Sequence, residues 1–161
     1  MTKLVHSMIR VLDEAVSVKF YRDTFGLAVV DRLDFESFTL IYMALPTSDF
    51  ELELTINKGR EAPYDLGDGY GHLAVVVDDL EAAHATAATA NSEPGDIVDF
   101  RPDGERVARF FFIQDPDGYQ IEVIEKGGRF KCMRATKKIA SKRHAGISSR
   151  AASLQAASSS T

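Results

Sequence analysis

The segment His6-Ser-Met-Ile-Arg-Val-Leu-Asp13 returns in altered form as His72-Leu-Ala-Val-Val-Val-Asp-Asp79. Each copy runs from a histidine through a stretch rich in β-branched or apolar residues and reaches an aspartate seven positions later. Such a stretch favours a β-strand, and an aspartate after it is typical of the residue that caps the start of a helix. The repetition predicts two copies of one structural module.

The residues after each repeated segment predict a helix followed by three strands. The first helix is expected from 13 to 26, capped by Asp13 and ended by Gly26, with a buried face formed by Val16, Phe20 and Phe25. The second is Ala-rich and is expected to begin at 78 or 79 and to run to about 90. Strands are expected at 27–35, 38–45 and 51–56, and again at 95–100, 107–114 and 119–125. The sequence thus predicts an α+β protein with two tandem βαβββ modules, at about 1–59 and 68–128.

Size and composition fit one compact domain over residues 1–128. The chain has 161 residues, of which 45% are apolar, enough for one core but not for several. No stretch approaches the roughly 18 consecutive apolar residues of a membrane helix, and no signal-peptide pattern follows Met1, so a cytoplasmic protein is expected. Cys132 is the only cysteine, which excludes an internal disulfide and a multi-cysteine zinc site.

Charge is distributed unevenly along the chain. Residues 129–161 contain eight of the 19 Lys and Arg residues and none of the 24 Asp and Glu residues, so residues 1–128 have a net charge of −13. An acidic body argues against binding of nucleic acid, which needs clustered positive charge. The basic tail has too few apolar residues to offset its ordering entropy, so we expect disorder there and no part in the chemistry.

The last strand of each module contains a glutamate that repeats with the histidine. Glu53-Leu-Thr-Ile-Asn-Lys-Gly59 and Glu122-Val-Ile-Glu-Lys-Gly-Gly128 both place a glycine six residues after a glutamate. Strand alternation puts Glu51, Glu53 and Thr55 on one face, so either glutamate could serve as a ligand. The repeat favours Glu53, because Glu53 aligns with Glu122 whereas Glu51 aligns with Gln120.

His6, Glu53, His72 and Glu122 therefore form a candidate metal site. Imidazole and carboxylate together suit divalent first-row metals, although ligand type alone does not choose between zinc, nickel, cobalt and manganese. A single histidine on a strand is more often a half-buried structural residue, and two acids on one strand face are often only solvated. The repeat of both residue types at matching positions is what distinguishes these four residues from ordinary strand histidines and glutamates.

Several short blocks, in this order, resemble glyoxalase I, the lactoylglutathione lyase family of the vicinal oxygen chelate superfamily. The resemblance covers about 3–126 and implies that the paired modules form a curved mixed sheet, the vicinal oxygen chelate fold. It also implies a homodimer in which each metal lies between subunits. The blocks are Leu4-Val-His-Ser-Met-Ile-Arg-Val11, Phe20-Tyr-Arg-Asp-Thr-Phe-Gly-Leu27, Glu53-Leu-Thr-Ile-Asn-Lys-Gly59, Tyr70-Gly-His-Leu-Ala-Val75 and Phe112-Ile-Gln-Asp-Pro-Asp-Gly-Tyr-Gln-Ile-Glu122.

The resemblance implies methylglyoxal detoxification, by isomerisation of the hemithioacetal of methylglyoxal and glutathione to S-lactoylglutathione. A metal suits this reaction because it can hold both vicinal oxygens and stabilise an enediolate. His6, Glu53, His72 and Glu122 match the metal ligands of the family, with Glu122 as the base and Glu53 in the matching role on the opposite face. The short connection 59–71 resembles the bacterial-type members, so nickel or cobalt is expected ahead of zinc.

Arg10 and Asn57 match positions that contact glutathione in the family, although a solvated strand arginine and a turn-forming asparagine are the alternative interpretations. Lys58 departs from the family, in which an aromatic residue is common there. The segment 105–109 departs as well. The cation that would hold the glycyl carboxylate of glutathione stays open among three residues, Arg101, Arg106 and Arg109.

Two other functions remain open. The same superfamily includes thiol transferases, epimerases and ring-cleaving dioxygenases, which typically have three protein ligands or a different residue at one position. A metal-free binding or resistance protein could use the same paired modules to hold a small molecule. Four metal-type residues with two glutamates favour the isomerase.

Overall fold

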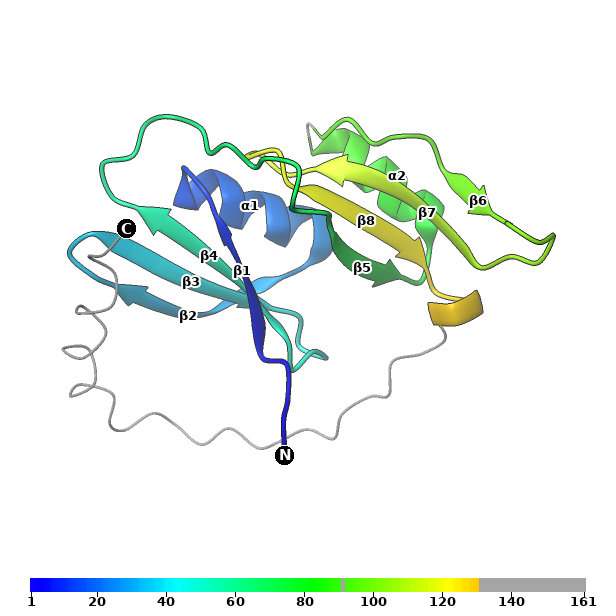
Figure 1. Ribbon diagram of the computed structural model, residues 1–161, viewed down its shortest axis with the longest axis horizontal. Coiled ribbons are helices and arrows are strands. Elements are labelled where there is room, and N and C mark those ends of the chain that lie inside the picture. The colour runs from blue at the N-terminus through cyan, green and yellow to red at the C-terminus, as the bar shows by residue number, and fades with distance from the viewer. Residues whose placement is uncertain (91, 131–161) are drawn as a thin grey trace.

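The protein is described by a computed structural model that covers residues 1–90 and 92–130 (Figure 1). Cys132 and the basic tail from 131 onward, with the disorder expected there, lie outside the described residues. The first module contains β1 (His6–Arg10), α1 (Glu14–Phe25), β2 (Ala28–Asp34), β3 (Phe38–Ala44) and β4 (Glu51–Asn57). The second contains β5 (Leu73–Val77), α2 (Leu80–Thr89), β6 (Val98–Phe100), β7 (Ala108–Gln114) and β8 (Gln120–Glu125), followed by a 3-10 turn, η1 (Gly128–Phe130). The predicted order of elements is confirmed.

The strands form two four-stranded mixed sheets with the same topology. Their orders are β1-β4-β3-β2 and β5-β8-β7-β6. In each sheet the first strand of the module pairs in parallel with the last strand, and the other pairs are antiparallel. Figure 1 shows the sheets side by side, with β1 and β5 toward the middle of the molecule. The α+β fold with tandem modules is therefore confirmed, and each module forms one of the two sheets.

Matching aspartates start the two helices. Oδ1 of Asp13 accepts a 2.9 Å hydrogen bond from the backbone N–H of Val16, and Oδ1 of Asp79 accepts one of the same length from Ala82. Each bond satisfies one of the free N–H groups of a helix start, which a capping side chain typically stabilises by about 1 kcal/mol. Gly26 ends α1 with a φ of 74°, where glycine has no steric penalty.

The buried face of α1 differs from the predicted one. Val16 is 49% exposed, whereas Ser17 and Tyr21 are buried beside Phe20. The reason lies in the second module, where the turn 115–118 offers carboxylates to both hydroxyls: Ser17 donates to Asp117 and Tyr21 donates to Asp115. The prediction that Val16 is buried was wrong. It selected the buried face by apolar side chains alone, whereas α1 packs against a polar turn.

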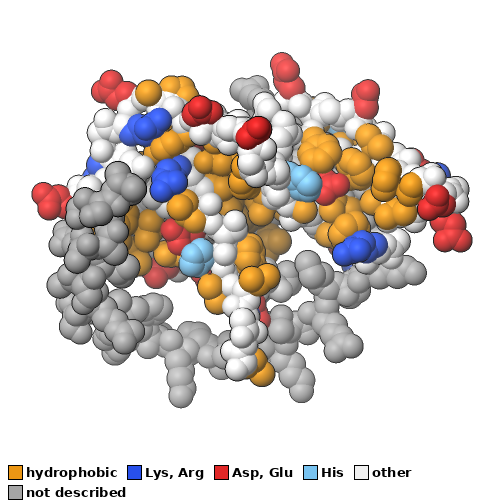
Figure 2. Space-filling model, in the orientation of Figure 1, with side chains coloured by type: hydrophobic (Ala, Val, Ile, Leu, Met, Phe, Trp, Pro, Cys, Tyr) orange, Lys and Arg blue, Asp and Glu red, His pale blue; other side chains and the backbone are white. Residues whose placement is uncertain are grey.

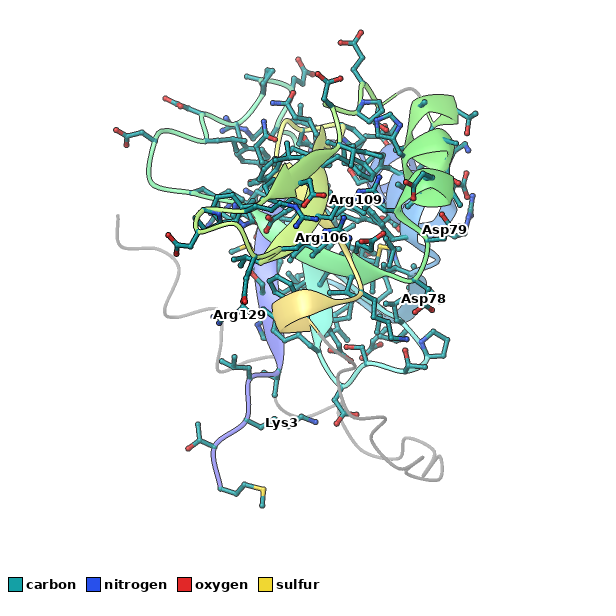
Figure 3. All side chains as sticks on the ribbon, turned by 90° about the vertical axis from the view of Figure 1, so that its right-hand side faces the viewer. Lys3, Asp78, Asp79, Arg106, Arg109 and Arg129 are labelled. Atoms are coloured by element: carbon teal, nitrogen blue, oxygen red, sulfur yellow. The ribbon has the colours of Figure 1, made fainter. Side chains whose placement is uncertain are left out.

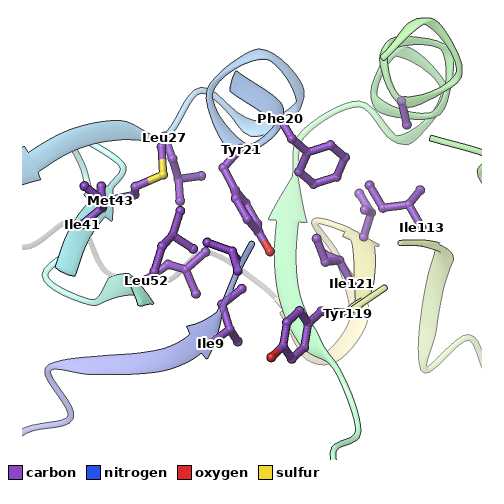
Figure 4. Close-up of a cluster of buried hydrophobic side chains, with 14 of the residues drawn as sticks. Ile9, Phe20, Tyr21, Leu27, Ile41, Met43, Leu52, Ile113, Tyr119 and Ile121 are labelled. Carbon is purple, nitrogen blue, oxygen red and sulfur yellow. The ribbon is translucent and has the colours of Figure 1, made fainter. Parts of the chain in front are cut away.

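One hydrophobic core joins the two modules. Phe20 and Tyr21 from α1 lie in the same buried cluster as Ile113, Tyr119 and Ile121 from the second module (Figure 4). Full burial of a large apolar side chain contributes about 1.5–3 kcal/mol, so these contacts hold the sheets in a fixed relation. Within the described ranges, no helix is long and apolar enough to cross a membrane.

Candidate active site

The first candidate half-site lies on the face of the sheet β1-β4-β3-β2 that points away from the hydrophobic core. His6 begins β1, and Met8, two residues on, is the register partner of Glu53 on β4. Glu53 is thus offset from His6 by two residues along the neighbouring strand, on the same face of the sheet. Across this offset His6 Nε2 and Glu53 Oε2 lie 3.3 Å apart. Tyr42 is the antiparallel partner of Glu53, and its ring meets the His6 ring edge-on at 5.9 Å between centroids.

The second half-site repeats this geometry. His72 directly precedes β5, and Ala74, two residues on, is the register partner of Glu122 on β8. His72 Nε2 and Glu122 Oε2 lie 3.2 Å apart. Phe112 is the antiparallel partner of Glu122, and its ring meets the His72 ring edge-on at 5.4 Å. The repeat seen in the sequence is thus a repeat in space.

The two half-sites do not merge within one chain. Among the described residues, no group of three or more His, Cys, Asp or Glu side chains gathers as a metal site would require. The imidazoles are open to solvent, with exposed fractions of 40% for His6 and 43% for His72. On the face seen in Figure 2, histidine side chains surface at two separate places, each beside an acidic side chain. The structure therefore brings the four predicted ligands together as two pairs.

Each pair has the donor types and the spacing of two ligands on one divalent ion. With bonds of about 2.1 Å and an angle of about 100° between them, a nitrogen and an oxygen donor lie about 3.2 Å apart. The observed separations of 3.3 and 3.2 Å match this value. Two ligands leave a first-row metal with several open positions, so a second pair is needed to close the site.

Residues 3–123 match the family model of the Glyoxalase/Bleomycin resistance protein/Dioxygenase superfamily. This match spans both modules and both half-sites. The chain belongs to that superfamily. A lactoylglutathione lyase from Neisseria meningitidis is 36% identical over 129 residues, which cover 77% of this chain and 91% of the relative.

Solved structures of the glyoxalase superfamily agree in fold. The trypanothione-dependent glyoxalase I of Leishmania major superposes with a TM-score of 0.63 at 31% identity, over 78% of this chain and 87% of that one. The V278E mutant of glyoxalase I from Zea mays gives a TM-score of 0.69 at 28% identity over 76% of this chain. This chain spans 44% of the maize protein, which is longer.

Glu53 and Glu51 occupy different environments, although they share a strand face. Among the residues that the structure describes, the Glu53 carboxylate meets an imidazole and the Glu51 carboxylate does not, and Glu53 is 8% exposed. Its Oε1 also accepts a 3.3 Å hydrogen bond from the hydroxyl of Thr55. Of these two glutamates, Glu53 is the one that the structure places beside His6.

Tyr42 and Thr55 are site residues to which sequence reasoning assigned no role. Burial, together with the neighbouring Glu53 carboxylate, raises the pKa of Tyr42 to about 12. The phenol is therefore a proton donor at any ordinary pH. The signal available in the sequence was the repeat, since Tyr42 and Phe112 are equivalent by register. This equivalence is hard to see in the sequence, because Tyr42 lies one position further from Glu53 than Phe112 lies from Glu122.

Arg10 and Asn57 lie on the same two strands as the first half-site. Arg10 ends β1, and its side chain follows His6 and Met8 on the exposed face. Asn57 ends β4, where its amide donates a 3.1 Å hydrogen bond to the hydroxyl of Tyr64. Both lie at the C-terminal ends of their strands, beyond His6 and Glu53 along the chain.

The three arginines considered for the glycyl carboxylate already have carboxylate partners. Arg101 and Arg106 both bind Asp99, at 2.9 and 2.8 Å. Arg109, which is labelled next to Arg106 in Figure 3, binds Glu81 of α2 at 2.6 Å and Glu125 of β8 at 3.1 Å. A substrate carboxylate would have to displace these ion pairs.

A cavity of about 260 Å³ opens beside Glu122. Its walls are mainly apolar, and η1 closes one side of it. The cavity lies on the face of the sheet to which Phe112 and Glu122 point, so an apolar group can reach the carboxylate there. The lining residues are Phe100, Val107, Ala108, Phe110, Arg129 and Phe130.

Proposed function

We propose that this chain is a metal-dependent lactoylglutathione lyase that isomerises the hemithioacetal of methylglyoxal and glutathione to S-lactoylglutathione. One observation carries the proposal: each module presents a histidine and a glutamate at the same register, with donor atoms 3.3 and 3.2 Å apart. The similarity to the lactoylglutathione lyase of Neisseria meningitidis supports the choice of reaction within the superfamily.

His6 and Glu53 of one protomer would hold the metal together with the His72 and Glu122 of a second copy. The separation of the two pairs within the described part of one chain supports this homodimer, as does the exposure of both imidazoles. In a symmetric dimer each half-site of one copy meets the other half-site of its partner, so two complete sites form. Nickel or cobalt is proposed ahead of zinc.

The reaction moves a proton between adjacent carbons of the substrate. The bound metal would supply positive charge to the two neighbouring substrate oxygens as negative charge builds on them. Glu122 would take the proton from the first carbon, because its carboxylate lies beside the apolar cavity that can receive the aldehyde substituent. The equivalent of Glu53 in the second copy would face the same site from the opposite side. Arg10 and Asn57 would bind the glutathione part of the substrate.

The test is an assay of the metal-free protein, reloaded in turn with nickel, cobalt and zinc, against methylglyoxal with glutathione or trypanothione. We expect stoichiometric binding of a divalent ion and formation of the thioester. Glu122→Gln should lower turnover at least about a hundredfold while it still binds a substrate analogue. Glu51→Gln is the matched control, because it removes an acid from the same strand as Glu53 and should keep activity. A protein without metal and without thioester formation would instead be a binding protein.

A further inference from the structure

The two glutamates that the repeat makes equivalent have different neighbours. Glu53 has hydroxyl-bearing residues on two sides. Tyr42 is its partner across the antiparallel pair and lies on the same face of the sheet, and Thr55 donates a hydrogen bond to Oε1 at 3.3 Å. The other oxygen, Oε2, faces His6 at 3.3 Å. Both oxygens of this carboxylate therefore have fixed partners.

Glu122 has apolar side chains at the matching places. Phe112 stands where the first module has Tyr42, and Ile124 stands where it has Thr55. Oε2 faces His72 at 3.2 Å, and no hydroxyl group reaches this carboxylate within the residues that the structure describes. The side chain is also more open than that of Glu53, with exposed fractions of 18% and 10%.

The aromatic rings themselves are placed alike. Tyr42 meets His6 at an interplanar angle of 71°, and Phe112 meets His72 at 76°. The packing around the two histidines is thus conserved between the modules. The phenol hydroxyl is what distinguishes them.

We infer that Tyr42, assisted by Thr55, is a positioning residue that fixes Glu53 as a stationary metal ligand and leaves Glu122 as the carboxylate that is free to move a proton. The inference rests on the proposed function. It explains how a site built from two copies of one module obtains two carboxylates with different tasks. The strand position opposite the glutamate holds a hydroxyl donor, Tyr42, in the first module and an apolar ring, Phe112, in the second.

The physical basis is the orientation of a ligand by its outer partners. A hydrogen bond to a metal-binding carboxylate restricts its rotation, and loss of such a partner typically weakens metal binding about 10- to 100-fold. A carboxylate between Phe112 and Ile124 has no such restraint, so it can turn toward the substrate without breaking a hydrogen bond to a hydroxyl.

Three variants of the full chain test the inference. Tyr42→Phe and Thr55→Val each remove one hydroxyl at nearly constant shape, and Phe112→Tyr adds one beside Glu122. The affinity for Ni²⁺ and Zn²⁺ is measured by competition with a chromophoric chelator, together with the thermal unfolding midpoint. We expect Tyr42→Phe to weaken binding of both ions about tenfold, and Thr55→Val to weaken it by a smaller factor, with little change in the midpoint. Phe112→Tyr should retain metal affinity and lower kcat about tenfold at an unchanged KM, because the new hydroxyl would restrain Glu122.

Two results would overturn the inference: metal affinities within twofold of the native protein in both hydroxyl-removal variants, or an unchanged kcat in a folded Phe112→Tyr protein. Failure of the proposed function gives a different pattern. If the native chain forms no thioester but Tyr42→Phe still weakens metal binding, the reaction is wrong and the positioning of Glu53 stands. If the native chain is an active lyase and the variants bind metal as it does, only the role of Tyr42 is wrong.

Discussion

The hydroxyl of Tyr21 donates a 2.7 Å hydrogen bond to Oδ2 of Asp115, a residue 94 positions further along the chain. Both side chains are buried. The other carboxylate oxygen of Asp115 accepts from the backbone N–H groups of Asp117 and Tyr119, at 3.0 and 2.8 Å. This contact ties helix α1 of the first module to the turn that leads into β8, the strand that holds Glu122.

Loss of this hydroxyl should destabilise the whole chain. Tyr21→Phe leaves a buried carboxylate without its side-chain donor, so we expect a fall of about 2 kcal/mol in the free energy of unfolding. Urea denaturation followed by circular dichroism measures it. Tyr70→Phe is the control, since Tyr70 is 38% exposed and its loss should cost less than about 0.5 kcal/mol. Equal values for the two variants would contradict a specific role for the Tyr21–Asp115 contact.

The cost of Tyr21→Phe should also depend on pH. Burial raises the pKa of Asp115 above its ordinary value, while the hydrogen bonds from Tyr21 and the backbone lower it. The folded chain therefore holds this proton to higher pH than the unfolded chain, so the contribution of Asp115 to stability is greatest below the ordinary pKa and falls as pH rises through the raised value.

Because the Tyr21 hydroxyl favours the charged carboxylate, its removal should cost more near neutral pH than below about pH 4, where Asp115 is protonated. Urea unfolding at a series of pH values measures the difference. The same series in an Asp115→Asn background should show a cost that does not vary with pH. A cost independent of pH in the native background would mean that Asp115 is already protonated at neutral pH.

The elements could be predicted from the sequence because their signals are local. Asp13 and Gly26 bound α1 as the sequence indicates, and the alternation in 51–56 becomes β4. The packing of the modules could not be predicted. Its main contacts join residues about 100 positions apart, and they use polar groups such as Ser17 and Asp117, which in sequence look like surface residues.

The candidate site, like the fold, could be predicted from the sequence only in part. His6 and Glu53 could be chosen because the repeat marks them, and the structure places them side by side. The role of Tyr42 depends on strand register, which the sequence does not fix when the hairpins of the two modules differ in length. The separation of the half-sites depends on how the sheets are packed, and no local pattern encodes that.

Arg10 is predicted to act in binding and not in turnover. Replacement by alanine removes a charge-assisted contact worth about 1.5–3 kcal/mol, so KM for the glutathione hemithioacetal should rise at least about tenfold with little change in kcat. Steady-state kinetics on Arg10→Ala measures both. Arg32→Ala is the control, because Arg32 is bound to Glu14 on the surface. An unchanged KM, or a loss confined to kcat, would remove Arg10 from the substrate-binding set.

The arrangement of the metal centre between two chains can be tested by complementation. One variant has His6→Ala with Glu53→Gln, and the other has His72→Ala with Glu122→Gln, so each alone lacks one half of every site. If each site combines half-sites from different protomers, a mixed dimer contains one native site and one site with no native half. Random pairing of equal amounts makes half of the dimers mixed, so about a quarter of the native sites should return.

The two variants are co-expressed with different affinity tags, and mixed dimers are isolated by purification on both tags in succession. These dimers should bind one divalent ion per pair of chains and regain about half of the native specific activity, since one of their two sites is intact. Homodimers of either variant serve as controls and should be inactive. Mixed dimers with no more activity than these controls would show that each metal is held within a single chain, which would require the two half-sites to close on one another.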